Sequence, residues 1–184
     1  MARWLQLHAP PKCTPGVDPL SLNISERVLL VSGSASTTSS RTIESWKQKG
    51  IPVLRIPTSL FESENSSDLL IRTWMQTVIK SFQLKSRVVV NIGHPLKRSG
   101  NLKKHLRFHL AELTSRVLSN YSLDHLWVEG GSTASTLIRH LRWNQFEVLG
   151  NLSPGVVTLR QFKKELPLIT LKPGSYTWPD IFCV

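Results

Sequence analysis

The chain has 184 residues, 40% of them hydrophobic, and a formal net charge of +11 at pH 7. This length and composition fit one domain with a buried core of its own. There are only two cysteines, Cys13 and Cys183, so a disulfide framework is excluded and a reducing, cytoplasmic location is expected. The first residues form no long apolar segment, so we expect neither a signal peptide nor a membrane span.

The positive charge gathers in the middle of the chain. Between Leu69 and Ala111 there are nine Lys and Arg residues and no acidic residue. Such a surface attracts polyanions, so one interpretation is a basic interaction domain that binds nucleic acid. We favour a solvated basic helix surface, because the stretch contains no recognisable nucleic-acid-binding module. Nucleic acid is therefore not expected as a partner.

The recognisable elements start after a proline-containing segment. Residues 1–26 show no periodicity and are expected to form a tail or linker before a domain that spans 27–184. Within that domain, short apolar runs alternate with amphipathic helical patterns. In chain order the patterns predict a strand at 27–31, a helix at 38–50, a strand at 52–56, a helix at 66–82, a strand at 87–92, a helix at 102–117, a strand at 125–129, a helix at 133–143, and strands at 145–149, 156–160 and 168–171.

Strands that alternate with helices indicate βαβ units, and continuously apolar strands indicate a parallel sheet that is covered on both faces. The last third has strands without helices between them, which favours antiparallel pairing. The sequence therefore predicts an α/β fold: a doubly wound, mostly parallel sheet with helices on both faces and added antiparallel strands near the C-terminus. If the strand order is 3-2-1-4, the first and fourth strands are neighbours at the point where the order reverses.

Two loops of small residues lie in the same context, each between a predicted strand and the helix that follows it. One is Ser32-Gly33-Ser34-Ala35-Ser36-Thr37 and the other is Gly130-Gly131-Ser132-Thr133-Ala134-Ser135. A turn of this kind directs free backbone N–H groups outward at a helix N-terminus, where the helix dipole also favours an anion. Each loop alone is compatible with a plain helix cap, but if the first and fourth strands are neighbours the two loops flank one crevice.

Two later turns complete the set. Asn151-Leu152-Ser153-Pro154-Gly155-Val156 precedes a predicted strand, and Leu171-Lys172-Pro173-Gly174-Ser175-Tyr176 follows the last one. Both are compatible with simple turns. Lys172 could also meet a phosphate as a point charge, and Gly174 could let a ligand approach the backbone closely.

The order of these four segments resembles the C-terminal nucleotide-binding domain of the four-carbon acid sugar kinase family, the threonate, erythronate and oxo-tetronate kinases. Over residues 27–182, the family motifs G-S-x-S, G-G-[DE]-T-A, P-G-V, K-S-G-x-F-G and an Asp-Phe-like ending are matched by Gly33-Ser34-Ala35-Ser36, Gly130-Gly131-Ser132-Thr133-Ala134, Pro154-Gly155-Val156, Lys172-Pro173-Gly174-Ser175-Tyr176 and Asp180-Ile181-Phe182.

This resemblance implies an ATP-binding domain with Mg²⁺ attached indirectly. Kinase activity is expected only together with a separate or missing domain that holds the sugar acid, and that domain and ATP/ADP are the expected partners. No catalytic residue and no metal ligand is assigned in this chain. By resemblance, the expected nucleotide-binding residues are Ser34, Ser36, Gly130, Gly131, Ser132, Thr133, Gly155, Lys172 and Gly174.

Two positions depart from the family pattern. Ser132 stands where the family has an acidic residue, and an acid beside phosphates often helps to hold Mg²⁺. Glu129, directly before the glycines, could replace it. Pro173 stands where the family has serine, and it removes a backbone N–H. These departures leave two alternatives open: a basic interaction domain that kept the fold, and an α/β enzyme that binds sugar phosphates with the same loops.

Overall fold

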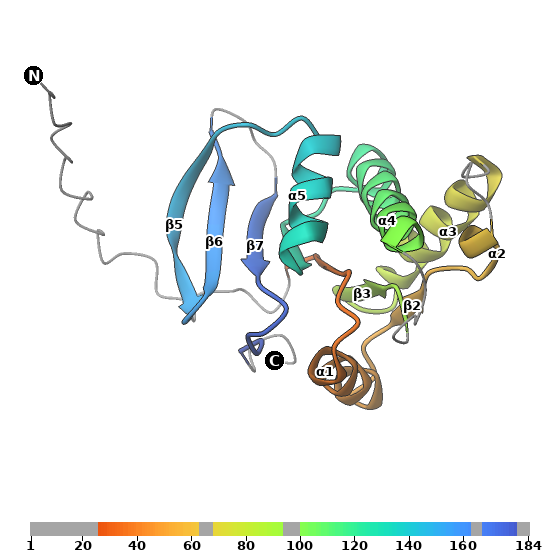
Figure 1. Ribbon diagram of the computed structural model, residues 1–184, viewed down its shortest axis with the longest axis horizontal. Coiled ribbons are helices and arrows are strands. Elements are labelled where there is room, and N and C mark those ends of the chain that lie inside the picture. The colour runs from red at the N-terminus through yellow and green to blue at the C-terminus, as the bar shows by residue number, and fades with distance from the viewer. Residues whose placement is uncertain (1–25, 63–67, 94–99, 163–166, 180–184) are drawn as a thin grey trace, which may run out of the picture.

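The computed structural model describes residues 26–62, 68–93, 100–162 and 167–179, so the predicted tail and the Asp180-Ile181-Phe182 ending lie outside the described residues. Its elements form one seven-stranded sheet with helices on both faces (Figure 1). In chain order they are β1 (Val28–Ser32), α1 (Thr37–Gln48), β2 (Val53–Arg55), α2 (Ser59–Glu62), α3 (Asp68–Ser81), β3 (Arg87–Asn91), α4 (Gly100–Asn120), β4 (His125–Glu129), α5 (Gly131–His140), β5 (Phe146–Ser153), β6 (Val156–Gln161) and β7 (Leu168–Lys172).

The strand order is β2-β3-β1-β4-β7-β6-β5. The first five strands of this order are parallel, and β6 and β5 add antiparallel pairs at one edge. The predicted α/β class and its antiparallel C-terminal strands are therefore confirmed. The adjacency of the first and fourth strands is also confirmed, since β1 and β4 pair along their whole length.

The assumed order 3-2-1-4 is wrong in its outer pair, because β3 rather than β2 lies beside β1. The five residues of β3 are all buried, whereas β2 has only three residues and none of them is fully buried. A continuously apolar strand is most stable where both faces and both edges are covered. The short β2 therefore takes the outer position at the sheet edge, where fewer of its groups need a partner.

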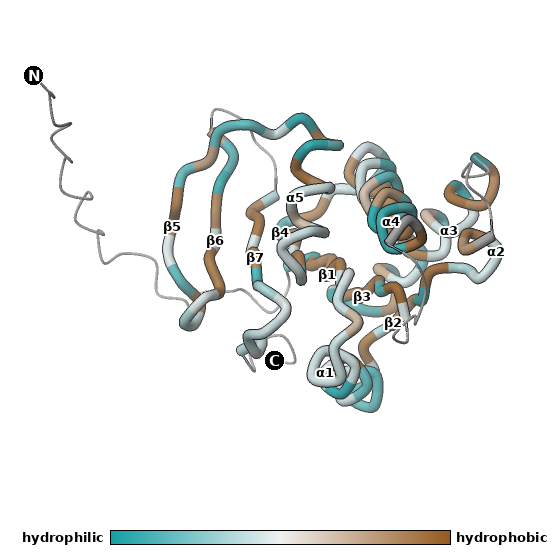
Figure 2. Tube along the Cα trace, in the orientation of Figure 1, coloured by the Kyte–Doolittle hydropathy of each residue, from teal (hydrophilic) through white to brown (hydrophobic). Residues whose placement is uncertain are grey.

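Alternate side chains of the central strands pack into two separate hydrophobic cores, one on each face of the sheet. Leu29 and Val31 of β1 pack with α3, α4 and α5, while Val28 and Leu30 pack with α1 through Ile43. Figure 2 shows the central strands as hydrophobic between these two layers. Because both faces of the sheet are covered, its one open approach to the parallel strands is along their ends.

The helix that follows β1 covers a different face of the sheet from the helices that follow β3 and β4 (Figure 1). The chain therefore leaves β1 in the opposite direction from both of its neighbours. A crevice opens at the carboxyl end of the sheet where successive connections diverge in this way. β1 has such a divergence on each side, toward β4 and toward β3.

Several element boundaries differ from the predicted ones for local reasons. α5 starts at Gly131 instead of residue 133, because Gly130 adopts φ +100° and acts as the N-cap. It ends at His140 instead of residue 143, because Arg142 adopts a left-handed backbone conformation with φ 55°. The short helix α2 was not predicted. None of the helices that the structure describes combines the length and apolar character needed to cross a bilayer.

Candidate functional site

A row of polar residues crosses the sheet at the carboxyl ends of the five parallel strands. The strand registers place the last residues of neighbouring strands opposite one another, and the row runs Arg55, Asn91, Ser32, Glu129, Lys172. All five have the strand parity of the residues that face α1. Four of the five are buried, the exception being Arg55. Buried polar groups require partners, so the partners of this polar row define what the site can do.

Glu129 connects the polar row to several other elements. Its Oε2 accepts hydrogen bonds from Ser32 Oγ and Ser39 Oγ, both at 2.7 Å. Its Oε1 lies 2.6 Å from Lys172 Nζ, and both side chains are only 1% exposed. Glu129 therefore ties β1, α1 and β7 together. Both of its oxygens already have partners within the protein, so Glu129 as a substitute ligand for Mg²⁺ stays a prediction.

Lys172 extends this connection to the turn that follows β7. Besides Glu129, its ammonium group donates to the carbonyl oxygens of Tyr176 at 2.6 Å and Pro173 at 3.2 Å. Three donors are all that a lysine has, so the group is saturated. The same nitrogen lies 5.3 Å from the centre of the Trp178 ring. The predicted contact between Lys172 and a phosphate thus remains a prediction that would require these bonds to open.

The first Ser/Gly loop is organised as a helix entry. Ser36 is the N-cap of α1, and its Oγ accepts a hydrogen bond from the Ser39 N–H at 3.1 Å. Ser34 Oγ donates to Ser36 Oγ at 3.1 Å, and a Cβ placed on Gly174 would lie 3.7 Å from the same Ser34 oxygen. The turn after β7 therefore lies against the loop after β1.

The second loop lies on the other side of the first. A side chain at Gly33 would collide with the Thr133 side chain, so the two loops are in close contact and a larger residue fits there only if Thr133 moves. The Gly130 N–H donates to the Lys172 carbonyl oxygen at 2.8 Å, which fixes the turn to β7. Gly131 and Ser132 are exposed in the first turn of α5. The N–H groups of a helix's first turn have no intrahelical acceptor, which suits them to bind an anion.

The structure brings most of the predicted site residues together. Ser34, Ser36, Gly174 and the Gly130–Thr133 turn surround the carboxyl ends of β1 and β4. Gly155 stands further out, in the β5–β6 turn, where it has φ +76° and a Cβ would lie 2.5 Å from the Tyr176 ring. It reaches the site only through that ring. Of these residues, Lys172 and Thr133 are buried.

The sequence analysis missed Ser39 and Asn91, and it named Ser32 only as the first residue of its loop. Ser32 and Asn91 are the last residues of apolar strands, which is the one signal that could have drawn attention to them. Ser39 gives no such signal, because its contact with Glu129 depends on where α1 crosses the sheet.

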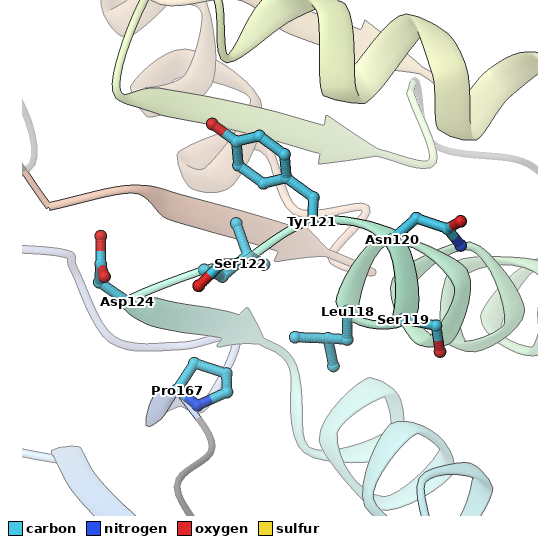
Figure 3. A pocket seen from close by; sticks show the side chains of 8 residues that line it. Leu118, Ser119, Asn120, Tyr121, Ser122, Asp124 and Pro167 are labelled. Atoms are coloured by element: carbon cyan, nitrogen blue, oxygen red, sulfur yellow. The ribbon is translucent and has the colours of Figure 1, made fainter.

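Size alone would direct attention to a different hollow. A hollow of about 630 Å³ lies at the amino ends of β4 and β7, the opposite end of the strands from the polar row. Its lining includes Tyr121, Asp124 and Pro167 (Figure 3). The Asp124 carboxylate is already paired with Arg27 at 3.0 Å. Open α/β sheets bind ligands at the carboxyl ends of their strands, and this hollow lies at the amino ends.

The fold and the two loops agree with what comparison with known proteins shows. Residues 29–181 match the sequence profile of a family described as the nucleotide-binding C-terminal domain. The chain therefore belongs to this family, which is the nucleotide-binding domain of the four-carbon acid sugar kinases. The resemblance predicted from the four segments is confirmed. No protein among those with a curated description matches the chain.

Solved structures share the fold at low sequence identity. A Salmonella typhimurium LT2 protein, provisionally described as a tRNA synthase, has a TM-score of 0.71 and 18% identity, and the match covers 86% of this chain and 40% of that one. Haemophilus influenzae protein HI1011, of family DUF1537, has a TM-score of 0.68 and 20% identity over 85% of this chain and 39% of that one. A Bordetella bronchiseptica DUF1537 domain with bound citrate has a TM-score of 0.65 and 16% identity over 83% and 38%. The chain thus spans about two fifths of these relatives.

Proposed function

We propose that this chain binds ATP and holds its phosphates between the N-termini of α1 and α5. The observation that carries the proposal is the contact of the two helix-entry loops, Gly33 against Thr133, at the carboxyl ends of adjacent parallel strands. Two helix N-termini whose entry loops touch supply backbone N–H donors and two positive dipole ends. This combination suits a chain of phosphate groups better than a single small anion.

The described residues fit the phosphates of ATP but offer Mg²⁺ no carboxylate at this point. Ser132 occupies the place of the acid in the family motif, and Glu129 is buried and already bound to Lys172, Ser32 and Ser39. We therefore expect any Mg²⁺ to be held by the phosphates and water. No residue of this chain is proposed as a direct ligand of the metal.

The chain is proposed to serve a four-carbon acid sugar kinase as its ATP-binding part. Phosphoryl transfer depends mainly on positioning and charge neutralisation, and the two loops provide both for the phosphates. A site for the sugar acid and a base for its hydroxyl group are proposed to come from a separate domain. That proposal is consistent with the share of each solved relative, 38–40%, that this chain covers.

Isothermal titration of the chain with ATP in the presence of Mg²⁺ tests the proposal, with a parallel thermal-shift measurement. Saturable heat and a raised melting temperature at millimolar ATP are expected, because a ligand that binds only the folded state stabilises it. An absence of both would overturn the proposal. Salt-sensitive electrophoretic shift of RNA or DNA, with no response to ATP, would favour the basic interaction domain instead.

A further inference from the structure

Helices α4 and α5 form one basic surface, on the face of the sheet that α1 does not cover (Figure 1). Residues 69–111, which include the first half of α4, contain no acidic residue, and neither do residues 130–146, which include all of α5. The two helices pack against each other, and His140 Nε2 of α5 lies 3.1 Å from Glu112 Oε2 of α4. Two acid-free segments that are distant in the sequence therefore meet on one surface.

The cationic groups of this surface have no acidic partners among the described residues. Glu112 is the only acidic residue in the sequence of the two helices, and its carboxylate is already bound by Arg116 Nε at 2.7 Å and by His140. Five cationic side chains of α4, α5 and the turn that follows are exposed or half-buried and make no ion pair within the described part of the chain: Lys103, Lys104, Arg107, Arg139 and Arg142. Cations that no acid neutralises attract a polyanion.

An aromatic ring stands within this surface. Phe108 is 46% exposed, and its ring meets the His140 ring edge to face, with 5.4 Å between the ring centres. Lys104 lies one turn before Phe108 on α4, and Arg139 directly precedes His140 on α5. Cations from two helices therefore flank an open aromatic ring that the contact with His140 holds in place.

This combination matches a single strand of nucleic acid. Phosphates along the strand bind the cations, and an unpaired base stacks on an exposed aromatic ring. Duplexes keep their bases stacked inside, whereas RNA exposes unpaired bases in its loops and at its ends. The basic stretch of α4 alone predicts only a solvated helix surface, but the neighbouring α5 and the open ring provide the contacts that such a helix lacks.

A membrane surface fits the same charges less well. A helix that binds at a bilayer surface inserts a broad apolar stripe among the lipids. Leu106, Leu110 and Leu113 form the apolar side of α4, and all three are buried in the core of the domain. Among the described residues of α4, Phe108 is the one large apolar side chain that is exposed. One ring is enough for a stacked base but too little for insertion.

We propose that the α4–α5 surface, formed by Lys104, Arg107, Phe108, Arg139 and Arg142, binds single-stranded RNA. This function goes beyond the proposed ATP binding and does not depend on it. Phe108 contacts His140, the last residue of α5, whereas the phosphate loop lies at the first residue, and the helix between them is about 14 Å long. RNA and ATP can therefore be bound at the same time.

The test is the fluorescence anisotropy of a labelled oligouridine RNA of about 15 nucleotides, which carries phosphates and unpaired bases. Binding at low salt is expected, with an affinity that decreases as the salt concentration rises. Lys104→Glu should weaken binding about tenfold and make it less dependent on salt. The matched control is Lys49→Glu, which makes the same charge change at the C-cap of α1 on the other face of the sheet. It should weaken binding by less than about twofold, because salt screens a charge at that distance.

The ring is tested separately from the charge. Phe108→Leu keeps an apolar side chain but removes the aromatic face, so it should weaken RNA binding about tenfold, whereas Phe108→Trp should keep the wild-type affinity. Circular dichroism checks that each variant is folded. If Phe108→Leu does not fold, the comparison of Lys104→Glu with Lys49→Glu decides.

The proposal is refuted if oligouridine does not bind at low salt, if Lys104→Glu and Lys49→Glu weaken binding equally, or if folded Phe108→Leu binds as the wild type does. Displacement of the RNA by ATP and Mg²⁺ would place it at the phosphate loops and would also refute the proposal. So would tighter binding to a DNA duplex or to vesicles that contain phosphatidylserine. RNA binding without ATP binding would support this proposal and refute the proposed function alone.

Discussion

At the scale of single residues, the most consequential feature is the ion pair between Glu129 and Lys172. Both groups are almost fully removed from water, and each has further hydrogen bonds from a different segment. Burial of two charges stabilises a fold only weakly in net terms, because desolvation offsets their attraction. The value of the pair therefore lies in position: it holds the loop after β1, the start of α1 and the turn after β7 in one arrangement.

Removal of one member of this pair should be strongly destabilising. Lys172→Met leaves the Glu129 carboxylate buried without its cation, so the free energy of unfolding should fall by about 3–5 kcal/mol. The double variant Lys172→Met with Glu129→Gln removes both charges and should recover much of that loss. Urea denaturation of the three proteins measures the effect. Equal stability of the single variant and the wild type would contradict the buried pair.

At the scale of elements, the contact between the two loops sets the distance between the helix N-termini. Gly33 lies so close to Thr133 that a methyl group cannot fit without movement, whereas a Cβ on Gly131 meets nothing within 4 Å. A glycine is thus required by close packing in the first loop, whereas the glycine in the second loop has open space where a side chain would lie. Close packing makes even one added carbon unfavourable at the first position.

Gly33→Ala should therefore lower the free energy of unfolding by about 1–3 kcal/mol, because the loops must separate to accept the methyl group. Gly131→Ala is the matched control for stability, and its free energy of unfolding should stay within about 0.5 kcal/mol of the wild type. Chemical denaturation of both variants provides the comparison. A Gly33→Ala protein as stable as the control would show that the loops do not touch in solution.

The element level is also where sequence reasoning succeeded and then stopped. The apolar runs that form β1, β3 and β4 were visible, and so were the small-residue loops that follow β1 and β4. Which strands are neighbours was not, because hydrophobic pattern carries no information on strand order. The Glu129–Lys172 pair and the position of Asn91 beside Ser32 depend on that order. They could be found only from the fold.

At the scale of the whole molecule, one buried histidine couples stability to pH. His125 of β4 is 1% exposed, and its Nε2 lies 2.7 Å from Thr170 Oγ1. Burial lowers the pKa of His125 below its ordinary value of 6.5, although Glu26 partly opposes the shift. As the pH falls, His125 of the unfolded chain therefore binds a proton near pH 6.5, whereas His125 of the folded chain binds one only at lower pH.

The free energy of unfolding should consequently decrease as the pH falls below about 6.5, and the decrease should level off below the folded-state pKa of His125. His125→Gln keeps a polar side chain but removes the titration. Urea denaturation at about pH 7.5 and 5.5 should show a smaller loss of stability in this variant than in the wild type. An identical loss in both proteins would assign the pH dependence to other groups.

The whole-molecule account depends on phosphates meeting the exposed first turn of α5 and the cap of α1. Backbone amide resonances report that contact most directly. In a ¹⁵N-labelled sample titrated with ATP and Mg²⁺, the largest shift changes should fall on Gly131, Ser132 and Thr133 and in the Ser34–Ser36 loop. Changes confined to other segments, or none at millimolar ATP, would contradict the claim that the two helix N-termini form the phosphate site.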